Sequence, residues 1–217
     1  MNRSAAEIVR EYAFPAVDAV HGVTYDGRHV WFASGDKLSA FDPANATIVR
    51  SIDVAAHAGT AFDGRHVFQL AEARIQKIDP ASGRVLATIP APGGGGDSGL
   101  AWADGTLWVG QYRERKIHQI DPETGAILRT IESNRFVTGV TWVDGALWHG
   151  TWEGEESELR RVDPTTGEVL EALQLPSGVG LSGLESDGGD RFYCGGGKSG
   201  TVRAVRRPAR GPKAAPA

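Results

Sequence analysis

Three titratable side chains occupy positions at which the other repeats of the sequence carry different residue types: His21, His149 and Glu185. A histidine exchanges its proton near neutral pH, so two histidines could act as acid and base. A glutamate in a narrow, dehydrated channel would have a raised pKa and could exchange a proton too. We therefore predict these three as catalytic residues. Two alternatives stay open: a divalent metal ion with His21, His149 and Glu185 as ligands, and purely structural hydrogen bonds.

A second group of polar and aromatic residues is predicted to bind the substrate. They fall at the ends of strand-like runs or in the loops between repeats, where a rigid fold usually presents its binding residues. They are Gln69, Gln111, Arg113, Trp152, Glu153 and Arg135. Glu153 belongs to a short acidic insertion, for which a solvated loop is the alternative interpretation.

A ring of mostly small, polar residues is expected around the axis of the molecule. Each of them directly precedes a glycine that recurs about every 40 residues: His21, Ala58, Ser98, Thr138 and Ser182. His57, Asp97 and Arg135, from the loops between repeats, fall beside this ring. We predict the ligand site at the ring, on the face of the loops that join successive repeats, because those loops vary in sequence. The expected partner is a small molecule or a peptide end.

The repeat that carries these residues has four apolar, strand-like runs. An Asp-Gly pair follows the first run, as in Asp26-Gly27, and an Asp-Pro pair follows the third, as in Asp42-Pro43. Both pairs suit turns between strands, so we interpret their aspartates as turn residues rather than metal ligands. Aromatic residues that recur in the second run are predicted to pack between repeats: Trp31, Phe68, Trp108, Trp148 and Tyr193.

The size of the repeat predicts a β-propeller, in which four-stranded blades close into a ring. The fifth copy ends at Arg207-Pro208 without its fourth run, whereas residues 7–15 resemble that run. The predicted fold class is therefore all-β: a five-bladed β-propeller with four antiparallel strands per blade and an N-terminal strand closing the last blade. Residues 1–208 are predicted as a single domain and residues 209–217 as a disordered tail. The blades are expected at about 18–54, 55–91, 95–133, 135–176 and 179–207, the last completed by 7–15.

The composition narrows the classes of function. A net charge of −4 over 217 residues offers no basic surface for phosphate backbones, so no nucleic-acid partner is expected. No window suits a membrane span or a signal peptide, and we expect a cytoplasmic monomer that does not bind membranes. The single cysteine, Cys194, excludes an internal disulfide. It is either a buried thiol or a nucleophile that His149 would activate.

The chain resembles two families of propeller enzymes. The strings Asp-Gly-Ala-Leu-Trp at 144–148 and Arg-Arg-Val-Asp-Pro-Thr-Thr-Gly-Glu-Val at 160–169 are similar to late blades of the glutamine cyclotransferase family. That resemblance runs from His21 to Val205 and implies a five-bladed propeller that converts N-terminal glutamine to pyroglutamate. The segments 20–23 and 147–153 are similar to the streptogramin lyase (virginiamycin B lyase) family, whose members have seven blades.

The first resemblance also contains a departure. Cyclotransferases carry a catalytic glutamate in a Gly-Glu-Gly-Ile string of the second blade, and this chain has Ala58 at that place. The resemblance therefore implies the fold and the location of the site, but not the chemistry of single residues. We expect an enzyme that acts on a small molecule or a peptide terminus. A metal-assisted lyase or hydrolase and a non-catalytic binding propeller are the alternatives.

Overall fold

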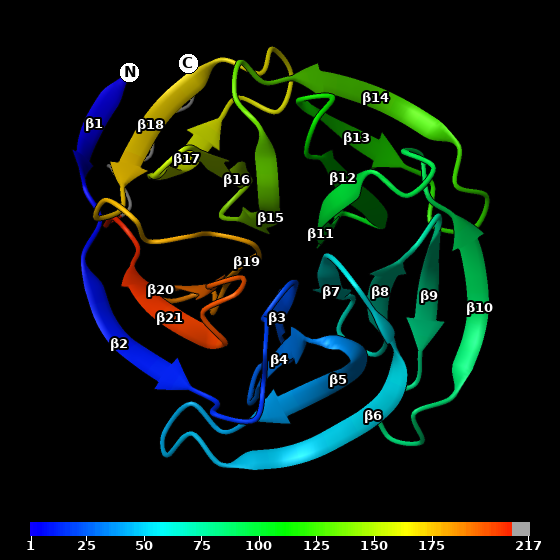
Figure 1. The fold of residues 1–217 in the computed structure, drawn as a ribbon. Coiled ribbons are helices and arrows are strands. Elements are labelled where there is room, and N and C mark those ends of the chain that lie inside the picture. Colours follow the sequence, from blue (N-terminus) through cyan, green and yellow to red (C-terminus); the bar gives the residue numbers. More distant parts are fainter. Residues whose placement is uncertain (210–217) are drawn as a thin grey trace.

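The computed structural model describes residues 1–209 as five sheets arranged around a central axis (Figure 1). This part of the chain forms strands and no helices, and so it contains no helix long and apolar enough to cross a membrane. The predicted five-bladed, all-β propeller is confirmed. Of the predicted tail, residues 210–217 lie outside the described residues.

Each sheet is one blade, with its strands ordered from the axis to the perimeter. Blade 1 consists of β3 (Val23–Tyr25), β4 (Val30–Ala33), β5 (Gly35–Phe41) and β6 (Ile48–Ala56). Blade 2 consists of β7 (Thr60–Phe62), β8 (Val67–Ala71), β9 (Arg74–Ile78) and β10 (Val85–Pro90). Blade 3 consists of β11 (Asp97–Ala103), β12 (Thr106–Gln111), β13 (Lys116–Ile120) and β14 (Ile127–Glu132). Blade 4 contains β15 (Val137–Val143), β16 (Ala146–Glu153), β17 (Glu156–Val162) and β18 (Val169–Gln174), and blade 5 contains β19 (Leu184–Ser186), β20 (Arg191–Gly195), β21 (Thr201–Arg206) and β2 (Ile8–Ala13).

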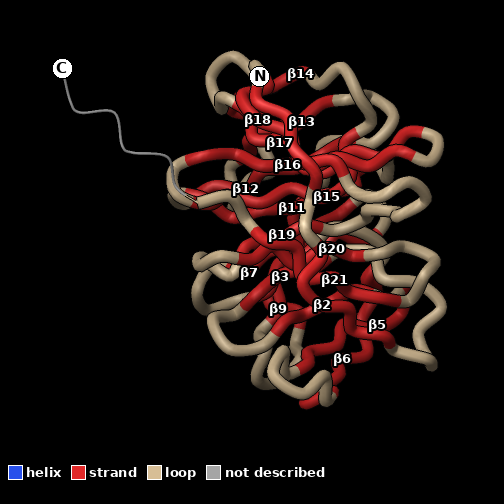
Figure 2. Tube along the Cα trace, turned by 90° about the vertical axis from the view of Figure 1, so that its left-hand side faces the viewer, coloured by secondary structure: helices blue, strands red, loops and turns tan. Residues whose placement is uncertain are grey.

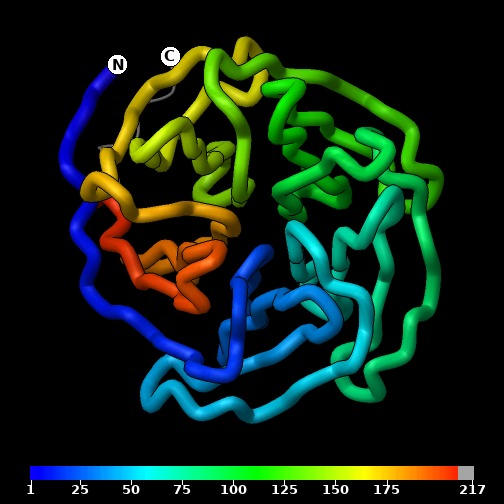
Figure 3. The backbone as a smooth tube through the Cα atoms, viewed as in Figure 1, coloured from blue at the N-terminus to red at the C-terminus, as the bar shows by residue number. Residues whose placement is uncertain are grey.

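The innermost strands meet around the axis, whereas the outermost strands run along the perimeter (Figures 1 and 3). An edge-on view shows the strands in the middle of the molecule and loops on both sides (Figure 2). The second strands are buried almost throughout because their two faces pack against neighbouring blades. The outermost strands are half in solvent, and β14 exposes Ile127 and Leu128.

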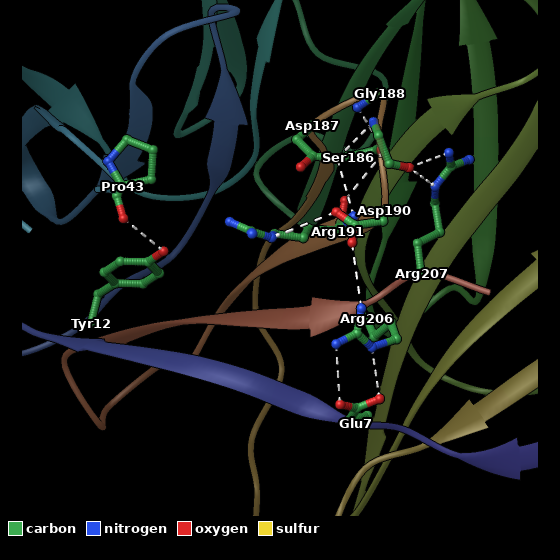
Figure 4. A network of polar contacts seen from close by, with 11 residues as sticks. Glu7, Tyr12, Pro43, Ser186, Asp187, Gly188, Asp190, Arg191, Arg206 and Arg207 are labelled. Atoms are coloured by element: carbon green, nitrogen blue, oxygen red, sulfur yellow. Dashed lines mark hydrogen bonds and ion pairs between the residues drawn. The ribbon is translucent and has the colours of Figure 1, made fainter. Parts of the chain in front are cut away.

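The strand β2 closes the ring, as the sequence predicts. It pairs antiparallel with β21, and Glu7 just before it binds Arg206 through both carboxylate oxygens, at 2.8 and 3.3 Å (Figure 4). On its other side, the Tyr12 hydroxyl donates a hydrogen bond of 3.1 Å to the carbonyl of Pro43 in blade 1 (Figure 4). The buried Tyr12 and Phe14 rings join the core cluster between blades 5 and 1. One N-terminal segment therefore links the last blade to the first.

A further strand, β1 (Asn2–Ala5), extends the predicted arrangement. It pairs in parallel with β18, so that blade 4 has five strands. Arg3 donates a hydrogen bond of 2.7 Å to Glu158 on β17. Equivalent positions in blades 1, 2 and 3 are basic and would repel an arginine, which gives a physical reason for docking on blade 4. By the pairing register, these are Lys37, Arg74 and Lys116.

The predicted packing aromatics and turn aspartates have the expected surroundings. The five predicted packing aromatics are at most 4% exposed, and Trp108 stacks on Trp142 of the next blade with 5.6 Å between ring centroids. In the Asp-Pro turns, the aspartate accepts hydrogen bonds from backbone N–H groups two or three residues later, as Asp163 does. These bonds hold the pKa of Asp163 below its usual value. The repeated carboxylates therefore stabilise turns.

Candidate active site at the propeller axis

A cavity of about 300 Å³ opens at one end of the propeller axis. All five residues of the expected ring line it, and all five blades therefore contribute to it. Neighbouring residues complete the wall with the aromatic rings of Tyr112 and Trp152 and with the side chains of His57 and Asp97. The lining residues are His21, His57, Ala58, Asp97, Ser98, Tyr112, Thr138, Trp152, Leu181 and Ser182.

The glycine that follows each ring residue explains why the ring is narrow. A Cβ atom on Gly22 would lie closer than 3.0 Å to backbone atoms of blade 2, and one on Gly183 would meet the backbone of blade 1 in the same way. Gly59, Gly99 and Gly139 make equivalent approaches to the next blade. Only glycine permits this backbone contact. The recurring glycine therefore draws the innermost strands together and brings the ring residues around one cavity.

Burial changes the acidity of two groups in this wall. Burial lowers the pKa of His21 below its ordinary value of 6.5, and the nearby His57 lowers it further. Burial raises the pKa of Asp97 above 3.8, although the Gly93 N–H bonds both carboxylate oxygens at 3.0 Å. The amide of Gln111 approaches Asp97 at 3.4 Å. The cavity thus joins a histidine whose neutral form is favoured with a carboxyl that retains its proton more readily than an ordinary aspartate.

Two aromatic side chains form a fixed part of the wall. The Tyr112 ring stacks on Phe136 with a centroid distance of 4.7 Å, and its hydroxyl donates to the carbonyl of Trp152 at 3.2 Å. The Trp152 indole N–H donates to the carbonyl of Gly154 at 2.9 Å. Because both polar atoms are already bonded within the protein, the two rings offer mainly apolar surface to a ligand.

The predicted binding residues divide between this cavity and other places. Of the six, Trp152 lines the cavity, and Gln111 lies behind it against Asp97. Glu153, at the end of β16, forms an ion pair with Arg135 at 3.9 Å between the closest atoms, and Arg113 is exposed. These three do not line the cavity.

Gln69 lies inside blade 2, and its polar atoms are fully used. It accepts from the Thr60 hydroxyl at 2.7 Å and donates to the carbonyls of Ala58, Gly59 and Leu70. The residue has no exposed surface. Its contacts are those of a buried structural amide, not of a residue that lines the axial cavity.

The three predicted catalytic residues are not brought together. His21 lines the axial cavity, whereas His149 is 1% exposed and lines a different cavity between blades 3 and 4. Glu185 lies on β19 and accepts hydrogen bonds from Thr24 and Thr141 of the two neighbouring blades. Burial raises the pKa of Glu185 to about 7.

The metal alternative requires these donors in one place. Among residues 1–209, no group of three or more histidine, cysteine, aspartate and glutamate side chains has an arrangement that could hold a metal ion. The proposed ligand set of His21, His149 and Glu185 does not fit a metal centre, because its members occupy separate surroundings.

Asp97 and His57 were outside the predicted catalytic set although both line the cavity. Their signal was present in the sequence: each stands two residues before a repeat glycine, at equivalent places in blades 2 and 3.

Cys194 is 3% exposed, and burial raises the pKa of its thiol to about 12. Its surroundings agree with the buried-thiol alternative rather than with an activated nucleophile.

Comparison with known proteins extends the description of the fold. No protein-family model and no curated protein matches the chain. Among solved structures, it is similar to a glutaminyl cyclase from Myxococcus xanthus with a TM-score of 0.79 and 18% sequence identity, over 94% of this chain and 97% of that one. It is also similar to a virginiamycin B lyase from Staphylococcus aureus with a TM-score of 0.53 and 14% identity, over 91% of this chain and 69% of that one. At these identities the likeness shows the propeller fold alone.

Proposed function

We propose that this chain is an enzyme that acts on a small polar molecule or a peptide N-terminus in the axial cavity. The observation that carries the proposal is the meeting of His21 and Asp97 in the wall of one cavity of about 300 Å³. Their pKa values are shifted in opposite directions from those of ordinary histidine and aspartate. A pair of titratable groups with environments that shift their pKa values in this way suits acid–base catalysis.

The first reaction to test is the cyclisation of N-terminal glutamine, because a glutaminyl cyclase shares the fold. In this reaction the α-amine nitrogen forms a bond to the side-chain carbonyl carbon, the amide C–N bond breaks and ammonia leaves. Neutral His21 would accept the proton of the attacking amine. Protonated Asp97 would return a proton to the departing nitrogen. The family glutamate is absent at Ala58, so Asp97 from the next blade takes the place of the carboxyl group in this proposal.

The cavity wall supports a substrate with one polar end. His21, His57 and Asp97 supply the polar part, and Tyr112 and Trp152 supply apolar surface. A volume of about 300 Å³ suits a single residue or a small molecule rather than a folded chain. A peptide could enter with its first residue inside and the rest along the irregular loops.

The experiment is a turnover assay with peptides that begin with glutamine. Turnover is measured as release of ammonia and as loss of mass by mass spectrometry. Peptides that begin with N-acetylated glutamine are the control, because their blocked amine cannot attack. Release of ammonia from the free peptides alone would support the proposal. Binding without turnover, detected as a rise in Tm, would favour a non-catalytic propeller. The absence of both binding and turnover with a wider panel of small amides would overturn the proposed site.

A further inference from the structure

A second cavity, of about 230 Å³, lies between blades 3 and 4 and shares no lining residue with the axial one. Its apolar wall combines Ile117 and Ile131 of blade 3 with Val162 and Val169 of blade 4. Its polar residues are Glu132, Ser133, Asn134 and His149. The proposed function makes no use of this cavity or of His149.

His149 presents a hydrogen-bond acceptor that has no partner within the protein. Its Nδ1 lies 3.1 Å from the carbonyl oxygen of Gly150, and since a carbonyl only accepts, Nδ1 carries the proton. The other ring nitrogen, Nε2, is then an unprotonated acceptor, and no described residue donates to it. Burial lowers the pKa of His149 to about 4, which keeps the ring neutral.

The histidine is also unusual for its place in the blade. Equivalent positions on the second strands of the other blades carry an aromatic, an amide, an aliphatic and a thiol side chain. By the pairing register they are Phe32, Gln69, Val109 and Cys194. The blade fold therefore accepts several side chains here and does not itself require an imidazole.

A chain of charged contacts holds the Asn134 part of the cavity wall. The Asn134 side-chain oxygen accepts a hydrogen bond of 2.7 Å from Arg160, which is itself paired with Glu158 at 2.7 Å. Glu158 also accepts from Arg3 of the N-terminal strand. Because Arg160 and Glu158 are both buried, their geometry is fixed without a ligand. The cavity is thus formed in advance.

We propose that this cavity binds a neutral molecule of about the size of phenol, with an apolar body and one hydrogen-bond donor directed at Nε2 of His149. An unprotonated Nε2 pairs only with a donor, and the four aliphatic side chains of the wall suit an apolar body. The volume lies below the range of about 300–1,000 Å³ that drug-sized ligands occupy, which favours a single ring. A water molecule could satisfy Nε2, but it would leave the aliphatic wall without contacts.

Phenol and its methyl ether, anisole, test this proposal in a thermal unfolding assay. They have similar apolar bodies, but only phenol donates a hydrogen bond. Phenol at ten times its Kd should raise the Tm of the wild type by about 3 °C. Anisole at the same concentration should have less than half that effect. Equal shifts for the two compounds would overturn the role given to His149.

Two variants introduce at position 149 the side chains that other blades carry at the equivalent position. His149→Phe, as in blade 1, removes the acceptor and should abolish the response to phenol. His149→Gln, as in blade 2, keeps an acceptor oxygen and should retain part of it. His21→Ala changes only the axial cavity and should respond to phenol as the wild type does. A full response in His149→Phe would contradict the proposal.

An NMR titration of the wild type avoids dependence on the folding of the variants. Phenol should shift the Nε2 resonance of His149 while Nδ1 remains protonated, and it should leave the His21 ring unchanged. Shifts confined to His21 and His57 would assign phenol to the axial cavity. No shift at any ring at concentrations that solubility allows would show that the cavity holds water only, and it would overturn the proposal.

Discussion

The hydroxyl of Thr24 donates a hydrogen bond of 2.8 Å to Oε2 of Glu185, across the boundary between blades 5 and 1. The other carboxylate oxygen accepts from Thr141 of blade 4 and from the backbone N–H of Ser186 at 2.8 Å. One carboxyl group therefore links three innermost strands near the axis. Because burial raises its pKa to about 7, this link responds to pH.

Replacing Glu185 with glutamine should change how stability depends on pH. The folded pKa of about 7 lies above the ordinary 4.5, so the contribution of this carboxyl to stability is fully present below pH 4.5 and is lost as the pH rises through about 7. The full shift corresponds to about 3 kcal/mol, and we expect about 2 kcal/mol because part of the residue surface is exposed. The difference in unfolding free energy between wild type and Glu185→Gln, measured with urea from pH 4.5 to 8, should fall by this amount. A difference independent of pH would contradict the prediction.

Substitutions in the axial cavity should separate the two limbs of a pH–rate profile. Neutral His21 needs a pH above its lowered pKa, and protonated Asp97 needs a pH below its raised pKa. In kcat/KM for the substrate, His21→Gln and Asp97→Asn should each remove one limb of the profile, with a loss of about 10²- to 10⁴-fold. Exposed Arg113→Gln is the control with an unchanged profile. Profiles that keep both limbs in the His21 and Asp97 variants would exclude these groups as the acid and base.

Removing Glu158 should strongly destabilise the fold, because Arg160 would remain as a buried charge without its partner. Their side chains are 2% and 5% exposed. We expect Glu158→Gln to cost about 3 kcal/mol of unfolding free energy. Arg3→Ala should cost about 1 kcal/mol or less, because the Arg3 side chain is 48% exposed. Urea unfolding checks both, and equal losses in the two variants would refute the account.

Tyr12 should dominate the contribution of the N-terminal strand to ring closure. Its ring is 1% exposed and packs 4.8 Å from Phe41 of blade 1, measured between centroids. Tyr12→Ala should destabilise the protein by about 3–5 kcal/mol, as large-to-small changes of buried aromatic residues do. Tyr12→Phe, which loses only the hydrogen bond to Pro43, should cost about 1 kcal/mol. Thermal unfolding of the pair measures the difference.

Cys194 should react with a thiol reagent only after unfolding. Burial raises the pKa of its thiol to about 12, so almost no thiolate exists at neutral pH. Labelling with a disulfide reagent should therefore be slow in buffer and complete within minutes in urea. Rapid labelling of the folded chain at pH 7 would show that the thiol is accessible and return the nucleophile alternative to consideration.

The ring of residues around the axis could be predicted from the sequence. The recurring glycine and the residue before it were readable from the repeat, because each blade must bring its innermost strand to the same axis. The repeat therefore predicts that the five residues form one ring. All five line one cavity: His21, Ala58, Ser98, Thr138 and Ser182. The closing strand was readable as well, because the fifth repeat lacks its last run and the N-terminus supplies it.

The repeat pattern was sufficient to predict the propeller, its number of blades and the place of the axial ring. Which titratable groups share a cavity became clear from the packed structure. His21 directly precedes the repeat glycine at the mouth of the innermost strand, whereas His149 lies on a second strand, β16, and lines the cavity between blades 3 and 4. The docking of β1 on β18 of blade 4, with Arg3 bound to Glu158, was likewise absent from the repeat pattern. A repeat pattern fixes the blade and strand of a residue, whereas the direction of its side chain and its long-range partners depend on packing between blades.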